Sequence, residues 1–439
     1  MSYEKRVILK HSAASIVALA LFGISRFIYS LFISRKFGIE ALGSANSLIS
    51  QAFLIAIPLS FFAVGLGKYS AEFLGRGQIE RIRSMSTIGF ASILIGVVLL
   101  PLNFYLALIS IFRAFQLTFR SFFYGIHRGE VYAYITLAAF CVFLLSFLIS
   151  NIYLPYIALL GAVTLLGVLY NLKNSLFSKP TSEDFKLLLA YSSMAFLGTL
   201  AGVFLIQGPY FMSEKLGSAT IAGKVSASLS AAFLLTYLPQ VLQSAIMPLY
   251  SYKYGKNEMD YVKKLAEGTT EILSYIIALI TFGGLIIGRE ILSYMFGFSL
   301  GREFYLALIA IEVYIAYNPS IVALSSTRYI KDSTLISIFG AIATLIAWFF
   351  LIPAMKETGA MLGLLIGYAL IFSGVAYFSK KRLEISLKSY KPLLFALPLQ
   401  VSFLISKIAV MFALIVYLYL MKEEAKKGLH LLGKIKGGQ

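Results

Sequence analysis

Four ionisable side chains lie inside long apolar segments, where a charge is expensive. Arg26 and Arg113 lie in the first and fourth segments, Lys224 in the eighth and Glu312 in the tenth. A charged residue at the centre of a membrane helix costs about 2.5–3.5 kcal/mol on insertion scales, so it normally faces a cavity or a partner. Three of the four groups are cations, and arginine binds phosphate through paired hydrogen bonds. The set therefore predicts a cavity that attracts an anionic group.

Uncharged polar side chains accompany these charges. Arg113, Gln116 and Arg120 are spaced i, i+3 and i+7, so they share one face of a helix. Glutamines within other apolar segments add amide groups. We predict that the following residues bind the ligand of this cavity: Arg26, Arg113, Arg120, Lys224, Gln51, Gln116, Gln207 and Glu312.

Each of these charges could also have a purely structural role. Arg26 and Lys224 can extend their charged ends to the membrane surface, and Glu312 can be a structural partner for a cation. The first half of the chain favours the cationic cavity, because none of its acids before Glu183 lies in the middle of an apolar segment. Those acids are Glu4, Glu40, Glu72, Glu80 and Glu130.

The elements that position these side chains are membrane-spanning helices. The 439 residues are 59% hydrophobic and only 13% charged, with a mean hydropathy of +0.84. A soluble domain carries about 25% charged residues. The apolar runs are continuous and about 20 residues long, which is the length of a transmembrane helix and unlike the alternating pattern of a barrel. We predict an all-α integral membrane protein with 12–14 transmembrane helices.

Hydropathy and the positions of glycine, proline and charge locate the spans. The last apolar region is interrupted by Lys407, which favours two short helices there. The predicted spans are 11–34, 42–72, 85–101, 103–126, 131–150, 153–175, 186–213, 217–250, 266–288, 303–327, 333–352, 359–379 and 392–420.

The basic residues indicate how the helices are oriented. With the N-terminus inside, 28 lysines and arginines fall in cytoplasmic segments and 7 in outside segments. Cytoplasmic loops of membrane proteins carry such an excess. We therefore expect a multi-pass protein of the cytoplasmic membrane with both termini in the cytoplasm.

Two parts of the chain resemble each other. Lys36-Phe37-Gly38 matches Lys215-Leu216-Gly217, and a long helix with a central proline follows each, at Pro58 and Pro239. Loops 75–80 and 254–259 also match, at an offset of 179 residues. Six spans separate corresponding points, so the two halves are predicted to be parallel repeats. The expected division is a six-helix lobe at 1–180, a second at 181–383, and an additional C-terminal helix or helix pair with a basic tail at 384–439.

Several function classes are excluded by what the chain contains. The net charge is +18, but the basic residues are dispersed between spans, which argues against nucleic acid as a partner. The three histidines are scattered and Cys141 is alone, so we expect no metal site, no cofactor and no enzymatic activity. A membrane-embedded glycan polymerase is disfavoured, because those enzymes usually carry a large outside loop and none is expected here.

Three motifs resemble a known family. The segments 37–43 (FGIEALG), 68–77 (KYSAEFLGRG) and 359–363 (GAMLG) are similar to Wzx-type polysaccharide-biosynthesis proteins of the multidrug/oligosaccharidyl-lipid/polysaccharide (MOP) exporter superfamily. The resemblance implies a V-shaped, two-lobed transporter with alternating access. It implies a polyprenyl-(pyro)phosphate-linked oligosaccharide as substrate, the lipid bilayer as surroundings and a monomeric state.

The resemblance also bears on individual residues. Related lipid II flippases line their cavity with arginines of the first helix and a basic residue of the eighth, which Arg26 and Lys224 match here. The alternative within the superfamily is a cation-coupled multidrug antiporter, for which Glu312 is the acid to mutate. The lack of an acidic first-lobe site disfavours that branch. A coupling cation, H⁺ or Na⁺, stays open.

Overall fold

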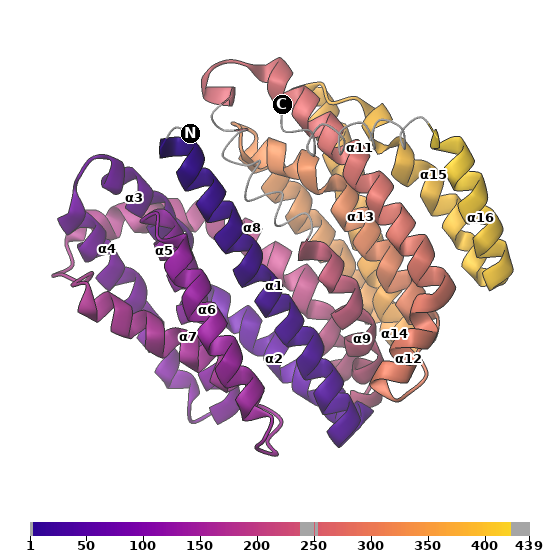
Figure 1. The fold of residues 1–439 in the computed structure, drawn as a ribbon, viewed down its shortest axis with the longest axis horizontal. Helices are drawn as coiled ribbons and strands as arrows, with labels where there is room; N and C mark the ends of the chain where they lie inside the picture. Colours follow the sequence, from indigo (N-terminus) through magenta and orange to yellow (C-terminus); the bar gives the residue numbers. More distant parts are fainter. Residues whose placement is uncertain (1–2, 238–249, 251–252, 423–439) are drawn as a thin grey trace. The chain divides into compact units, whose positions relative to one another are not determined.

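The computed structural model describes residues 3–237, 250 and 253–422, and within these the chain is helical with no strand (Figure 1). Eleven of the described helices are long and apolar enough to cross a membrane. The prediction of an all-α integral membrane protein is confirmed. The chain divides into two compact units, residues 1–223 and 224–439, and each is described by itself.

The first unit is built from eight α-helices, one 3₁₀ segment and the start of a ninth helix. Seven of its helical stretches are long and apolar enough to cross a membrane, and they follow the order of the predicted spans. The helical elements of the unit are α1 (Tyr3–Phe37), α2 (Ile39–Leu59), α3 (Ala63–Gly75), α4 (Ile79–Ala91), η1 (Ser92–Leu99), α5 (Phe104–Gly125), α6 (Gly129–Ser146), α7 (Leu154–Lys173), α8 (Ser182–Lys215) and the first residues of α9 (Ala219–Ala232).

The predicted span 42–72 is wrong in one respect, because the structure has two helices there. α2 ends at Leu59, one residue after Pro58, and α3 begins at Ala63. Proline lacks an N–H and weakens the helix around it. The Ser60 hydroxyl then donates to the Ala56 carbonyl at 2.7 Å and competes with the helical ladder. Periodicity alone could not show this break, because the residues on both sides are equally apolar.

The second unit contains the remaining described helices. They are the rest of α9, η2 (Phe233–Thr236), α11 (Met259–Gly283), the π-helical η3 (Gly284–Gly288), α12 (Arg289–Phe296), α13 (Arg302–Ser325), α14 (Ile330–Leu383), η4 (Leu387–Tyr390), α15 (Lys391–Gln400), η5 (Val401–Leu404) and α16 (Lys407–Leu420). Pro239, which was part of the predicted repeat, lies outside the described residues.

The long helix α14 is a hairpin. Its backbone breaks at Lys356, which has φ 55° and ψ −131°, between the two spans predicted at 333–352 and 359–379. The Trp348 indole N–H donates to the Ala360 carbonyl across the two arms at 2.9 Å. Gly367 faces the Thr344 side chain so closely that a β-carbon there would overlap it. Small residues let membrane helices approach in this way.

The C-terminal apolar region forms two short pieces, as predicted. α15 continues into η5, and the Ser406 hydroxyl accepts a hydrogen bond from the Ala409 N–H at 3.1 Å to cap α16. Lys407, the first residue of α16, pairs with Glu290 of α12 at 2.6 Å. Both α15 and α16 (yellow in Figure 1) pack against α11.

Two loops of the predicted repeat adopt the same turn. Gly77 and Asn257 both have positive φ, at 70° and 59°. The residues after them, Gln78 and Glu258, have nearly identical angles, φ −89° and ψ 65° against φ −88° and ψ 59°. Glycine and asparagine are the residues that adopt this left-handed conformation most readily. The structural offset is 180 residues, one more than the sequence match indicated, and the shared geometry supports the predicted repeat at this point.

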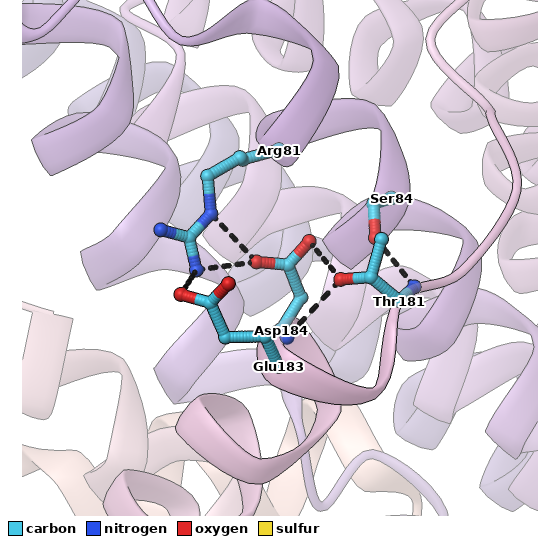
Figure 2. Close-up of polar contacts among 5 residues, drawn as sticks. All are labelled: Arg81, Ser84, Thr181, Glu183 and Asp184. Carbon is cyan, nitrogen blue, oxygen red and sulfur yellow. Dashed lines mark hydrogen bonds and ion pairs between the residues drawn. The ribbon is translucent and has the colours of Figure 1, made fainter.

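An ion pair ties the start of α8 to α4 (Figure 2). Thr181 caps α8, and the Arg81 guanidinium binds Asp184 through its Nε at 2.8 Å and its Nη2 at 2.7 Å. The same guanidinium reaches Glu183 at 3.0 Å, and the Thr181 N–H donates to Ser84 at 3.1 Å. This cluster fixes two helix ends that are far apart in the sequence.

The charge state of this cluster follows from its contacts. Burial alone would raise the pKa of the Asp184 carboxyl. Hydrogen bonds from Thr181, Ser84 and the Arg81 guanidinium outweigh burial and hold that pKa below its usual range. Asp184 is therefore ionised when the protein is folded, and its charge is matched by Arg81.

Candidate functional site

The predicted cation Arg26 is held by side chains of three helices of the first unit. From α1 its guanidinium donates to the Gln207 Oε1 of α8 at 3.0 Å and to the Ser50 Oγ of α2 at 3.3 Å. Ser50 in turn donates to the same Gln207 oxygen at 3.1 Å. Arg26 is half-buried and its Nε has no partner in the described structure. Arg26 and Gln207 both belong to the predicted set, and the structure brings these two side chains into contact.

Aromatic rings fix the plane of this guanidinium. The Arg26 Cζ lies 4.2 Å from the centre of the Tyr210 ring and 5.9 Å from that of Phe53. Tyr210 is fully buried and Phe53 is 7% exposed. A cation over an aromatic ring gains about 0.5–2 kcal/mol, more when water is excluded. The ring contacts restrain Arg26 without neutralising its charge.

Phe53 also brings Arg113 into the same site. The Arg113 Cζ lies 4.4 Å from the centre of this ring, so two cations from α1 and α5 share one aromatic neighbour on α2. Arg113 donates to the Gln116 Oε1 at 2.7 Å, and Gln116 donates to the Tyr132 hydroxyl of α6. The i, i+3 spacing on α5 therefore produces the predicted contact.

The remaining first-unit candidates lie farther from this centre. Arg120 is one turn beyond Gln116 and interacts electrostatically with Tyr132. Gln51 donates to Ser47 on its own helix at 3.3 Å and makes no described contact with Arg26. Its neighbour Ser50 takes that place, because successive residues of a helix point in different directions.

Three contacting residues were absent from the predicted set: Ser50, Phe53 and Tyr210. A signal for them existed in the i, i+3 spacing of Ser50 with Phe53 and of Gln207 with Tyr210. We name Arg26, Arg113, Ser50, Phe53, Gln207 and Tyr210 the arginine site. Arg26 has no acidic side chain among its described contacts, so a positive charge is retained at this site.

Lys224 has a different environment in the second unit. Its Nζ pairs with Glu357 at 2.7 Å, next to the break in α14. Glu303 at the start of α13 interacts with the same lysine. Two acids thus compensate the charge of Lys224, in contrast to the uncompensated charge of Arg26.

Glu312 is the most deeply buried of the predicted residues. It lies in the middle of α13 with no exposed surface, and its Oε2 accepts a hydrogen bond from the Gln400 Nε2 of α15 at 2.7 Å. Its other oxygen, Oε1, has no partner in the described structure. Among the described residues, no group of three or more histidine, cysteine or acidic side chains is placed to hold a metal ion.

Comparisons with known proteins identify the fold. A scan against protein-family models and a search of curated proteins find no match. Solved structures do match. An inward-facing multidrug resistance MATE family transporter of the MOP superfamily has a TM-score of 0.66 at 13% identity, covering 86% of this chain and 98% of its own. The lipid II flippase MurJ, in an inward closed conformation, has a TM-score of 0.61 at 14% identity, covering 93% and 99%. The Vibrio cholerae MATE transporter VcmN in its bent form has a TM-score of 0.56 at 13% identity, covering 88% and 98%.

The chain therefore has the helical fold of MOP-superfamily transporters. The similar structures include a multidrug transporter and a lipid flippase, and each is spanned over nearly its whole length. The fold is shared by both kinds of protein, so the fold alone assigns no function to this chain.

Proposed function

We propose that this protein is an alternating-access flippase that moves a polyprenyl-(pyro)phosphate-linked oligosaccharide across the cytoplasmic membrane. The observation that carries the proposal is the arginine site, in which Arg26 and Arg113 share Phe53 and Arg26 has no described acidic contact. A site with excess positive charge inside the membrane is stabilised by an anionic ligand. The phosphate groups of the carrier lipid supply that charge.

The geometry of the arginine site suits phosphate in particular. Ring contacts hold the plane of the Arg26 guanidinium, and its buried Nε–H has no partner in the described structure. Guanidinium groups bind phosphate oxygens through two parallel hydrogen bonds, which require such a fixed plane. Gln207 and Ser50 now accept bonds from Arg26 and would be exchanged for phosphate oxygens when the ligand enters.

Further parts of the proposal extend the site to a transport cycle. The protein acts as a two-lobed monomer with cytoplasmic termini, and the lipid tail of the substrate stays in the bilayer. Arg120 guides the head group towards Arg113. Lys224 joins the binding of the head group in a state where its contact with Glu357 is released. A coupling cation, H⁺ or Na⁺, drives the cycle.

A surface-glycan complementation assay tests this proposal. A strain that lacks its own flippase of this class receives the wild-type chain, Arg26→Ala or Arg113→Ala, with Gln51→Ala as the matched control. We expect the control to restore surface glycan and both arginine variants to lose it, because the described contact of Gln51 is with Ser47 and not with either arginine. Full surface glycan in both arginine variants at normal expression would contradict the assignment of the site.

The second candidate function is a cation-coupled multidrug antiporter of the same superfamily. The observation that favours it is Glu312, a buried acid of the kind that cation coupling requires. Drug susceptibility of the same strain distinguishes the two functions. Resistance conferred by the wild type and unaffected by Arg26→Ala would favour the antiporter.

A further inference from the structure

The second unit contains a buried acid whose hydrogen bonds are incomplete. Glu312 and Gln400 are both without exposed surface, and they meet through the Gln400 Nε2 and the Glu312 Oε2 at 2.7 Å. The opposite oxygens, Glu312 Oε1 and Gln400 Oε1, are both buried without a partner in the described structure. The buried Thr281 hydroxyl of α11 interacts with the same carboxyl, to which it can donate. A buried acid with one unpaired oxygen therefore lies where α11, α13 and α15 pack together.

These oxygens are complementary to a proton. Two oxygens that both only accept hydrogen bonds cannot satisfy each other. A hydrogen on Glu312 Oε1 turns that atom into a donor, and the unpaired Gln400 Oε1, on the amide that already bonds this carboxyl, is a buried acceptor for it. Unpaired buried polar groups cost about 1–3 kcal/mol each, so one proton removes two such costs. It also removes the larger cost of an unpaired carboxylate in an apolar interior.

No cation among the described residues around Glu312 takes the role of the proton. Among the described residues, Glu312 interacts only with Gln400 and Thr281, and neither is charged. The neighbouring residues on α13, Ile311 and Val313, are apolar and buried. The described cations Lys224 and Lys407 of this unit pair with other acids, Glu357 and Glu290. One carboxylate and two neutral oxygens also provide too few ligands for a metal ion.

We propose that Glu312, Gln400 and Thr281 form an exchangeable-proton site that the C-terminal helix α15 completes. Glu312 holds the proton while Gln400 is in place. Movement of α15 or α11 away from α13 admits water, and the carboxyl then releases its proton to that water. The coupling part of this inference rests on the proposed transport function, whereas the bound proton does not.

Infrared spectroscopy of the full-length protein in lipid nanodiscs tests for the proton directly. The wild type at neutral pH is expected to show the C=O band of a protonated carboxyl that Glu312→Gln removes and the matched control Glu290→Gln leaves, because Glu290 is partly exposed and ion-paired. Gln400→Leu is expected to move the band to higher frequency, since the acid loses its amide partner. A carboxylate band in place of the protonated one, or a band that Gln400→Leu leaves unmoved, overturns the proposal. If the Glu312→Gln protein does not accumulate, the position of the C=O band in Gln400→Leu still tests the proposal.

Transport assays test whether the proton has to be exchanged. Glu312→Gln keeps the shape of the neutral acid but cannot release a proton, so it is expected to bind polyprenyl pyrophosphate within about twofold of wild type while it loses surface-glycan complementation. Full complementation by Glu312→Gln would overturn the exchange. The proton site and the flippase function can be rejected independently. The infrared measurement of Glu312 needs no substrate, and the arginine variants that test the flippase function do not alter Glu312.

Discussion

The arginine site and the Glu312 site hold groups of opposite kind, a cation and an acid, and each does so with a glutamine side chain. In the first unit the Gln207 amide presents its oxygen to the Arg26 guanidinium. In the second unit the Gln400 amide presents its nitrogen to the Glu312 carboxyl. An amide carries both a donor and an acceptor, so it stabilises either charge without cancelling it. A full counter-ion would cancel the charge, as Glu357 does for Lys224.

The two sites differ in access. Arg26 is half-buried and has an unpartnered donor, whereas Glu312 is sealed on all sides. A large anionic head group can approach only the first of these sites. Only a proton, which needs no cavity of its own, suits the second. In the two proposals, burial, and not the sign of the charge, separates the ligand site from the proton site.

The largest expected effect is on ligand binding at the arginine site. Arg26→Ala is expected to weaken binding of polyprenyl pyrophosphate by about 30-fold or more, because removing one member of a desolvated charged hydrogen-bond pair costs about 2–5 kcal/mol. Arg26→Lys keeps the charge but loses the planar fork, so its loss should be smaller, about tenfold. Affinity measured on the purified protein provides the test. Equal affinities for the wild type and Arg26→Ala would mean that the arginine site does not bind the ligand and so does not differ from the Glu312 site in this respect.

The Arg81–Asp184 pair is expected to stabilise the fold, whereas Arg26 is not, because Arg81 has a charged partner (Figure 2). Asp184→Asn is expected to lower the free energy of unfolding by about 2 kcal/mol, because it leaves Arg81 with only the exposed Glu183. Arg26→Leu should leave stability unchanged or raise it, because it removes a charge that has no described counter-ion. Thermal unfolding of the purified protein at neutral pH measures both. A larger loss for Arg26→Leu than for Asp184→Asn would mean that Arg26 is structural.

The same pair predicts a dependence on pH. The pKa of Asp184 is lowered in the folded protein, so its stabilising contribution is complete above the carboxyl's ordinary value of about 3.9 and is lost as the pH falls through the folded value. The difference in melting temperature between the wild type and Asp184→Asn should therefore narrow only in strongly acidic buffer. Glu183→Gln, on a mostly exposed side chain, is the control and should change stability by less than about 0.5 kcal/mol.

The smallest effect should come from the amide partner. Gln207→Leu leaves the Arg26 guanidinium without one of its acceptors and is expected to change affinity for polyprenyl pyrophosphate by only about three- to tenfold, because Ser50 and the two rings still position Arg26. Gln51→Leu, on the same kind of residue without that contact, should change nothing. Indistinguishable effects of the two variants would show that the amide has no role in holding Arg26.

From the sequence we could predict which residues share one face of a helix and which charged residues lie within apolar segments. The spacing of Arg113 and Gln116 predicted a contact that the structure contains. The partners of Arg26 and Glu312 could not be found in this way, because Gln207 is 181 positions from Arg26 and Gln400 is 88 positions from Glu312. Hydropathy gives the order of the helices but not which of their faces meet. The hydroxyl-assisted break after Pro58 was missed for a related reason, since it depends on one side chain and not on a periodic pattern.

The hairpin in α14 has a consequence for how the protein is made. Its two arms pack through Trp348 and Gly367, so they can enter the bilayer together as one insertion unit during synthesis. The tip carries Lys356 and Glu357, and one end of such a unit has to be translocated. Lys224, the partner of Glu357, belongs to a helix that leaves the ribosome more than a hundred residues earlier. Lys224 is therefore synthesised before the tip of the hairpin, and chain order supplies Glu357 with its counter-ion.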